Sequence, residues 1–255
     1  EALPMTIISG AELQVTSRLK AQGGERGALV GKAVPGVRIK VLRDIPSGQR
    51  ELRAFTECEV GEIGEVVVHG ANVSTSYLYR PEATIASKLV DGGDVWHRMG
   101  DMGYLDHDGN LFYCGRRAHV VESGGRLFHS VPVEEVFNEH PRVKRSALIA
   151  WHSGDRVVPG LVVEPKANAW PGSSTEATAF AEELVERGAN DSVTAPIRHI
   201  FFHRSFPVDP RHNAKIYRDK LAEWARGEKP IEVKKALAKE EAQVEPPQDQ
   251  REQSA

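Results

Sequence analysis

The stretch FPVDPRHNAKIYRDKL, residues 206–221, holds a polar loop bounded by prolines and followed by a helix-forming run. Its lysine, Lys215, stands directly before the helix, which we expect over 216–226. A lysine ammonium is a compact charge with three donors on a long stem. At the tip of a loop it can neutralise a carboxylate and a phosphate oxygen together as charge develops on them. For this stretch alone, the alternative is an exposed lysine at a helix start.

A second segment, HRMGDMGYLDHDGNLFYCGR at 97–116, has a turn signal between two short apolar runs. The turn from Asp106 to Gly109 predicts a β-hairpin. Asp101 then stands just before one strand and Arg116 just after the other, so the hairpin brings them close together. A carboxylate can accept hydrogen bonds from both hydroxyls of a ribose, and a guanidinium can bridge sugar and phosphate. From the spacing alone, a surface salt bridge across the hairpin end is the alternative.

A third segment, VVESGGRLF at 120–128, predicts another hairpin, with its turn at Gly124-Gly125. This hairpin leads into a helix expected over 131–139. Ser130 is the expected N-cap of that helix, with acidic residues in the first turn.

The rest of the chain changes between strand and helix periods. Residues 27–43 and 62–79 alternate and are rich in valine, which predicts strands. Pro81 begins a short expected helix that runs to Lys88. Further on we expect strands at 143–151, 160–164 and 197–203, and a helix at 175–187. Strands that alternate with helices indicate an α+β sandwich of modest size.

Taken in this order, the motifs resemble the adenylate-forming superfamily of acyl-CoA synthetases, peptide-synthetase adenylation domains and luciferases. The resemblance spans nearly the whole chain and rests on several stretches. These are GEIGEVVVHG at 61–70, SYLYRPEAT at 76–84, the segment at 97–116, ESGGRLF, PVEEVF, and PRHNAKIYRDKL at 210–221.

The resemblance implies an α+β chain in two parts. Residues 1–116 would be the end of a large N-terminal adenylation domain with its small β subdomain, and residues 117–228 a small mobile C-terminal lid domain. The charged composition of 229–255 predicts a disordered tail, with at most a short helix at 231–243. The family's Ser/Thr/Gly-rich phosphate loop has no counterpart here. We therefore expect the C-terminal half of a larger enzyme, with no ligase activity from this chain alone.

The resemblance also implies roles for single residues. Lys215 matches the adenylation lysine, Asp101 the ribose-binding aspartate, and Arg116 the arginine that follows it. Glu1 matches the magnesium-ligating glutamate, since a hard oxygen ligand suits Mg²⁺ shared with phosphates. ATP and Mg²⁺ are the implied cofactors. Ala118 stands at the hinge of the lid, where the family usually carries Asp or Lys.

Three departures from the family pattern indicate a branch within it. Besides Ala118, Ala214 replaces the glycine usual before the lysine, and Met99 the threonine common before Gly-Asp. HRMGD with FPVDPRHNAKI resembles the β-lactone synthetases of olefin biosynthesis. These activate a long-chain β-hydroxy acid, whose own hydroxyl closes the lactone, so no second substrate is needed. A fatty or β-hydroxy fatty acid is the implied substrate, and other olefin-pathway enzymes are candidate partners. A fatty acyl-CoA or acyl-AMP ligase, and a non-catalytic remnant of the fold, are the alternatives.

Composition places limits on the function class. The net charge of −3 over 255 residues gives no basic footprint for nucleic acid. Two cysteines are too few for a disulfide framework and predict a reducing, cytoplasmic location. No apolar run approaches membrane-spanning length. His199 and His203 lie four apart in an expected strand, without the neighbours that would complete a metal site.

Overall fold

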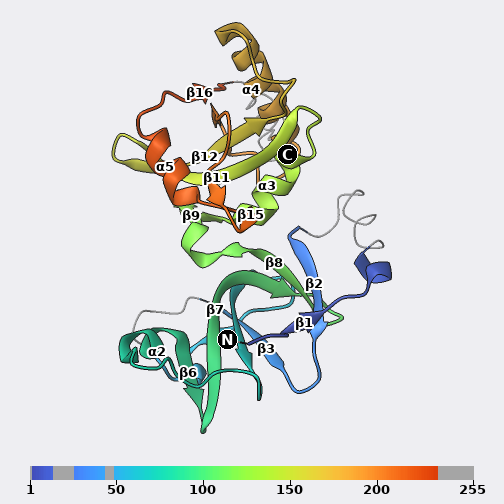
Figure 1. The fold of residues 1–255 in the computed structure, drawn as a ribbon, viewed down its shortest axis with the longest axis vertical. Helices are drawn as coiled ribbons and strands as arrows, with labels where there is room; N and C mark the ends of the chain where they lie inside the picture. The colour runs from blue at the N-terminus through green and yellow to red at the C-terminus, as the bar shows by residue number, and fades with distance from the viewer. Residues whose placement is uncertain (1, 14–25, 44–48, 235–255) are drawn as a thin grey trace, which may run out of the picture.

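The computed structural model describes residues 2–13, 26–43 and 49–234. Figure 1 shows two units, one drawn below the other, that meet where β8 (Asn110–Arg116) leads upward. The 3₁₀ helix η2 (Arg117–His119) joins them. We call the lower one the β unit and the upper one the sandwich unit. The expected mixture of sheets and helices is therefore observed, whereas the predicted domain boundaries and the mobility of the second part stay predictions.

The β unit is one antiparallel sheet, eight-stranded in the described residues. Its order is β1 (Thr6–Ile7), β2 (Ala28–Ala33), β8, β7 (Asp94–Leu105), β5 (Gly64–His69), β3 (Arg38–Arg43) and β4 (Thr56–Glu57), and β6 (Lys88–Asp91) also pairs with β7. Two short helices, η1 (Leu52–Ala54) and α2 (Pro81–Ser87), lie in its connections. Helix α2 begins at its proline, as the sequence predicts.

Strand β5 lies inside the sheet and is buried on both faces. Val66, Val67 and Val68 are each at most 1% exposed. Val67 packs with Trp96 on one face, while Val66 and Val68 pack with Leu111 on the other. Complete burial of one such side chain contributes about 1.5–3 kcal/mol. The continuous valine run therefore marks the best-covered strand of the β unit.

The two strands predicted upstream are wrong in extent. Residues 27–43 form two strands, because the chain turns at Gly36, whose φ of +83° suits glycine. Of residues 62–79 only β5 is a strand. The chain turns directly after it, where the Val73 amide donates to the Gly70 carbonyl at 3.0 Å.

The hairpin predicted at 97–116 is confirmed, with a longer first strand. Its turn is closed by the Gly109 amide, which donates to the Asp106 carbonyl at 3.1 Å. Asp101 lies within β7 rather than before it, because β7 is paired with β8 and β6 along one side and with β5 along the other. This longer pairing places Asp101 directly opposite Arg116.

The sandwich unit has a four-stranded sheet of order β11 (Val143–Ser153), β12 (Arg156–Pro165), β13 (His199–Phe202) and β16 (Ile231–Glu232). Strands β12 and β13 run parallel, and the other neighbours antiparallel. Beside the sheet lie the hairpin of β9 (Val121–Ser123) and β10 (Arg126–Phe128), the helices α3 (Ser130–Asn138), α4 (Ser174–Gly188) and α5 (Arg218–Ala225), and the hairpin of β14 (Val208–Asp209) and β15 (His212–Ile216).

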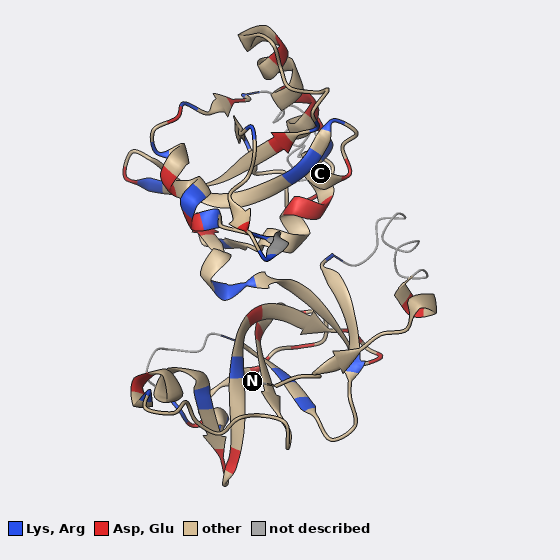
Figure 2. Cartoon of the chain, in the orientation of Figure 1, with Lys and Arg blue, Asp and Glu red and all other residues tan. Residues whose placement is uncertain are grey.

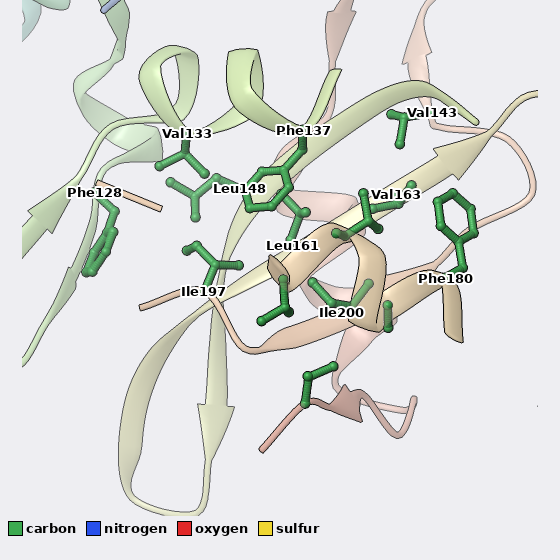
Figure 3. Close-up of a cluster of buried hydrophobic side chains, with 14 of the residues drawn as sticks. Phe128, Val133, Phe137, Val143, Leu148, Leu161, Val163, Phe180, Ile197 and Ile200 are labelled. Carbon is green, nitrogen blue, oxygen red and sulfur yellow. The ribbon is translucent and has the colours of Figure 1, made fainter. Parts of the chain in front are cut away.

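Alternate residues of β11 to β13 face two separate cores. Leu148 and Leu161 point to the side of α3 and α4, where Phe137 and Phe180 are fully buried (Figure 3). Ala147, Ile149, Val162 and Phe201 face the opposite side, where α5 packs through Leu221 and Ala225. The predicted α+β sandwich thus has helices on both faces of one sheet.

The capping role predicted for Ser130 is wrong. Ser130 is the first residue of α3, and the N-cap is His129, whose side chain makes no capping hydrogen bond. No acidic residue lies in the first turn. The Ser130 side chain is instead buried against Gly115, where an added Cβ would lie 2.2 Å from its Oγ.

The loop predicted around the lysine is a short hairpin. Lys215 lies on β15, which pairs with β14 and ends with the Tyr217 amide donating to the Pro207 carbonyl at 2.9 Å. Helix α5 therefore begins at Arg218, later than predicted.

The helix predicted at 231–243 is also wrong in its described part. Ile231 pairs with Ile200 at the edge of the sheet, and Val233 is buried in the core. These apolar residues continue the fold beyond the predicted start of the tail, and residues 235–255 lie outside the described ranges.

Two general features bear on location. Within the described ranges, no helix is both long and apolar enough to span a membrane. Cys58 and Cys114 are free thiols. The cytoplasmic location stays a prediction.

Candidate functional site

The structure brings Asp101 and Arg116 together across the β7–β8 ladder. The two are Cα partners, and Arg116 Nη1 lies 3.1 Å from Asp101 Oδ1. Arg116 Nη1 also donates to the Met99 carbonyl at 3.1 Å. The contact is thus the salt bridge across the hairpin end that the spacing of the two residues allowed.

The Asp101 carboxylate is poorly supplied with hydrogen bonds. Its Oδ1 is buried and, among the described residues, accepts none, because the nearby guanidinium is not in hydrogen-bond geometry. Burial raises the pKa of Asp101; the Arg116 charge opposes this rise, and Glu65 adds to it. A desolvated carboxylate with a vacant acceptor gains by accepting hydroxyl hydrogen bonds.

Arg116 is the exposed partner of the pair. Its side chain is 56% exposed, against 18% for Asp101. Figure 2 shows a basic stretch of ribbon where β8 leads into the sandwich unit, and Arg116 and Arg117 are the residues there. The guanidinium can therefore reach a further anion without breaking a buried contact.

Glu65 is a site residue that sequence reasoning missed. It is 4% exposed in β5 and accepts hydrogen bonds from Arg98 Nε at 2.9 Å and Arg98 Nη2 at 2.8 Å. Arg117 Nη1, from η2, lies 3.2 Å from the same carboxylate. A glutamate within a buried valine run was the available signal, since a buried charge requires a partner.

Lys215 is not joined to this pair. Its side chain is exposed on β15, and in the described part of the chain no hydrogen bond or ion pair links it to Asp101 or Arg116. Hydrogen bonds from the Arg211 amide and guanidinium lower the pKa of Asp209, and the Lys215 charge also contributes. Of the three residues predicted to bind the nucleotide, Asp101 and Arg116 therefore lie together, and Lys215 lies apart from them.

The start of α5 nevertheless faces the β8 side of the junction. Burial lowers the pKa of His119, and the charges of Arg218 and Arg116 lower it further. Burial raises the pKa of Tyr113 on β8, and the charges of Asp101, Arg116 and Arg218 all act on it as well. Arg218 stands three residues after Lys215, so the hairpin that carries the lysine is anchored close to the Asp101 strand.

The remaining predicted site residues lie at the edges of this region. Ala118 is exposed within η2. Glu1 lies outside the described residues. Elsewhere in the described ranges no group of three or more His, Cys, Asp and Glu could hold a metal. The His199 ring packs at a tilt against the Trp151 ring, with ring centroids 5.0 Å apart, as a packing residue does.

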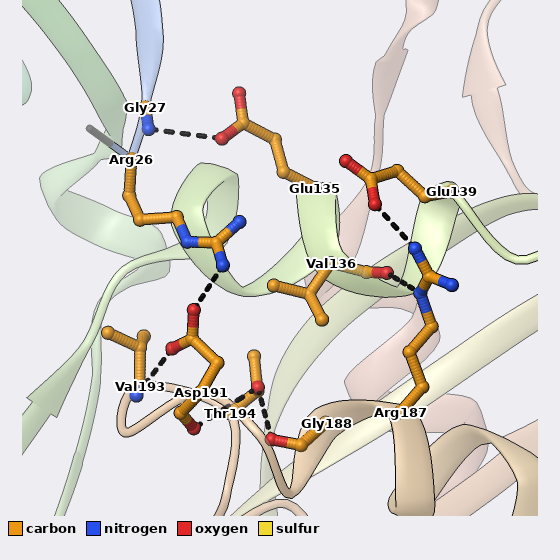
Figure 4. Close-up of polar contacts among 10 residues, drawn as sticks. All are labelled: Arg26, Gly27, Glu135, Val136, Glu139, Arg187, Gly188, Asp191, Val193 and Thr194. Atoms are coloured by element: carbon orange, nitrogen blue, oxygen red, sulfur yellow. Dashed lines mark hydrogen bonds and ion pairs between the residues drawn. The ribbon is translucent and has the colours of Figure 1, made fainter. Parts of the chain in front are cut away.

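A second set of contacts joins the two units (Figure 4). Arg26 forms an ion pair with Asp191 of the sandwich unit, and the Gly27 amide donates to Glu135 Oε2 of α3 at 3.0 Å. The Tyr104 hydroxyl donates to the Arg26 carbonyl at 2.8 Å. These contacts hold the units in the arrangement that places β8 beside α3.

The geometry can be set beside that of known proteins. No family profile matches the chain. The olefin beta-lactone synthetase of Stenotrophomonas maltophilia (strain K279a) is 38% identical over 236 residues, which are 89% of this chain and 41% of the relative. The chain therefore spans about two fifths of the length of this curated relative.

Two solved structures share its fold. The amide bond synthetase McbA from Marinactinospora thermotolerans matches with a TM-score of 0.62 and 26% identity, over 77% of this chain and 36% of the other. The o-succinylbenzoate CoA synthetase from Bacillus subtilis, solved with its acyl-adenylate intermediate, matches with a TM-score of 0.57 and 28% identity, over 76% and 35%.

The chain is similar in sequence and in fold to enzymes of the adenylate-forming superfamily. The resemblance drawn from its motifs is thereby confirmed, including the likeness to olefin β-lactone synthetases. The roles of Asp101, Arg116, Ala118, Lys215 and Glu1 stay predictions.

Proposed function

We propose that this chain is part of an ATP-dependent synthetase that activates an acid as its acyl-adenylate and releases pyrophosphate. The observation that carries the proposal is the buried Asp101 carboxylate, which has a vacant acceptor beside an exposed guanidinium. A scaffold has no use for a desolvated carboxylate that is short of hydrogen bonds. The likeness to adenylate-forming enzymes supplies the ligand that fits it.

In this proposal Asp101 and Arg116 bind the nucleotide. The Asp101 carboxylate accepts hydrogen bonds from the ribose hydroxyls and satisfies its vacant oxygen. Arg116 stays paired with Asp101 while its exposed nitrogens reach towards sugar and phosphate oxygens. Glu65 holds Arg98 and Arg117 and so keeps them from neutralising Asp101.

Lys215 acts in the chemical step. Its ammonium approaches the carboxylate of the acid and a phosphate oxygen as the carboxylate attacks the α-phosphorus and pyrophosphate leaves. An exposed side chain on a two-stranded hairpin suits a group that is brought in only for that step. Glu1 is the magnesium ligand in the proposal, on the basis of the family resemblance.

The finer proposal concerns the acid and the product. We propose a β-hydroxy fatty acid whose hydroxyl oxygen attacks the activated carbonyl carbon. The new C–O bond closes a β-lactone, AMP leaves as the bond between the carbonyl carbon and the phosphate oxygen breaks, and the hydroxyl proton goes to solvent. The name of the curated relative supports this product, as do the departures at Met99, Ala118 and Ala214.

An acyl-CoA or acyl-AMP ligase is the second candidate, because one of the matching structures is a CoA synthetase. Mass spectrometry separates the two. The complete protein, supplied with ATP and a long-chain β-hydroxy acid, should give β-lactone, AMP and pyrophosphate without coenzyme A. A strict need for coenzyme A, with a thioester as sole product, would establish the second candidate. No pyrophosphate from any fatty acid would identify a non-catalytic remnant.

A further inference from the structure

A largely buried ion pair of the sandwich unit begins three residues after Lys215. Glu134, on α3, accepts hydrogen bonds from Arg218 Nε at 3.0 Å and Arg218 Nη2 at 2.7 Å. The two side chains are 8% and 16% exposed. This two-pronged geometry fixes both the distance and the orientation of the guanidinium.

Glu134 is itself held from a third side. The Leu148 amide of β11 donates to Glu134 Oε1 at 2.9 Å, and the Ser146 hydroxyl lies 3.4 Å from the Glu134 carbonyl oxygen. The carboxylate therefore ties α3, β11 and α5 together at one point. Burial raises its pKa, and the Arg218 contact opposes that rise.

A buried ion pair of this kind sets the positions of the groups that it joins and adds little to the free energy of unfolding. The desolvation of two charges offsets most of their attraction, and an apolar pair of similar volume often serves stability as well or better. The site is surrounded by apolar packing, since α5 buries Leu221 and Ala225 against the same sheet. Apolar packing already holds α5 on the sheet, so the ion pair is not required for that purpose.

The position of the ion pair along the chain indicates a different purpose. Arg218 is the first residue of α5, and Lys215 precedes it by three residues on β15. The link between them is short and fixed, because Ile216 pairs with Val208 and the Tyr217 amide bonds the Pro207 carbonyl. The charge of Arg218 also acts on Tyr113, within β8, and on His119, in η2.

We propose that Glu134 and Arg218 form a positioning clamp for Lys215. The clamp fixes the position of the lysine hairpin relative to α3. It thereby fixes the direction from which Lys215 approaches the Asp101–Arg116 pair. Glu134 and Arg218 touch neither nucleotide nor acid and act through Lys215. The inference rests on the proposed function, in which Lys215 serves the adenylation step.

The test is a double-mutant cycle in the complete protein, read by acid-dependent exchange of labelled pyrophosphate into ATP. Arg218→Lys keeps the charge and loses the two-pronged contact. A misplacement of about 1 Å costs about 10²-fold in rate, so we expect kcat for exchange to fall about 10–100-fold with KM for ATP unchanged. Glu134→Gln, which keeps the shape and the contact to the Leu148 amide, should do the same.

The cycle distinguishes a clamp from a general defect. If Arg218 acts through Lys215, then Arg218→Lys added to Lys215→Ala should lower the rate no further than Lys215→Ala alone. Conversion of a chemically prepared acyl-adenylate to product should stay within twofold of wild type. Arg226→Lys, at the exposed C-cap of the same helix, is the matched control and should change nothing.

The outcomes separate the two ideas. Effects that multiply in the cycle, or a normal exchange rate in Arg218→Lys and Glu134→Gln, would overturn the clamp. A loss of the folded state in one variant leaves the other to decide, and a loss in both would show that the pair serves stability, which also overturns it. A normal rate in Lys215→Ala would refute the proposed function itself.

Discussion

The Asp101–Arg116 pair and the Lys215 hairpin are built in opposite ways. Asp101 and Arg116 lie on β7 and β8, two inner strands that are each paired on both sides. Lys215 lies on a separate two-stranded sheet, exposed, and anchored by one buried ion pair. Groups that only bind a nucleotide can be fixed in advance, whereas a group that acts on developing charge must be delivered and withdrawn.

The largest expected effect concerns the sheet that carries Asp101 and Arg116. Glu65→Ala leaves Arg98 buried without its carboxylate and should lower the free energy of unfolding by about 3–5 kcal/mol. Chemical denaturation measures it. Glu57→Ala, which removes the solvent-exposed partner of Lys40, is the control and should cost only about 0.2–1 kcal/mol. Equal losses in the two variants would show that Glu65 is no more than a surface partner.

Lys215→Ala tests the hairpin that carries the lysine. Adenylate formation in the complete protein should fall about 10²–10³-fold, as on loss of one electrostatic contact to the transition state. The dissociation constant for ATP should stay nearly unchanged. Lys220→Ala, on the exposed face of α5, is the matched control. Pyrophosphate release within about tenfold of wild type would contradict the assignment.

Asp101→Asn should separate binding from stability. ATP binding should weaken by about 1.5–3 kcal/mol, the worth of a hydrogen bond to a charged acceptor. Because burial raises the pKa of Asp101, its ionised form is disfavoured in the fold, and the variant should melt higher at neutral pH. Calorimetry measures both. Unchanged affinity with a lower melting temperature would make Asp101 a purely structural salt bridge.

The smallest effect is a pH dependence with the same origin. As pH falls, a carboxyl with a raised pKa, such as Asp101, takes up its proton while ordinary aspartates, with a pKa of about 3.9, are still ionised. ATP affinity should therefore fall as pH decreases towards that range, beginning above the usual aspartate value. The fall should be absent in Asp101→Asn. An identical profile in the variant would assign the titration to another group.

The sequence predicted those parts that depend on local chemistry. The Asp106–Gly109 turn and the Gly124-Gly125 turn both close the expected hairpins, and the first brings Asp101 to Arg116. The helix start at Pro81 follows from its fixed backbone angle.

What could not be predicted depends on contacts distant in sequence. Ser130 is used for packing against Gly115 and so cannot cap its helix. Ile231 joins a sheet edge that only the fold creates, where composition alone indicated a tail. Glu65 and Glu134 looked like ordinary charges, because their arginine partners lie far along the chain.

Acid-dependent exchange of labelled pyrophosphate into ATP tests the central claim most directly, because it reports adenylate formation without any second step. The complete protein with a long-chain β-hydroxy acid should exchange label in the absence of coenzyme A, and Lys215→Ala should lower the exchange about 10²–10³-fold while ATP still binds. Exchange that is absent with every fatty acid tried, or unchanged in Lys215→Ala, would contradict the account.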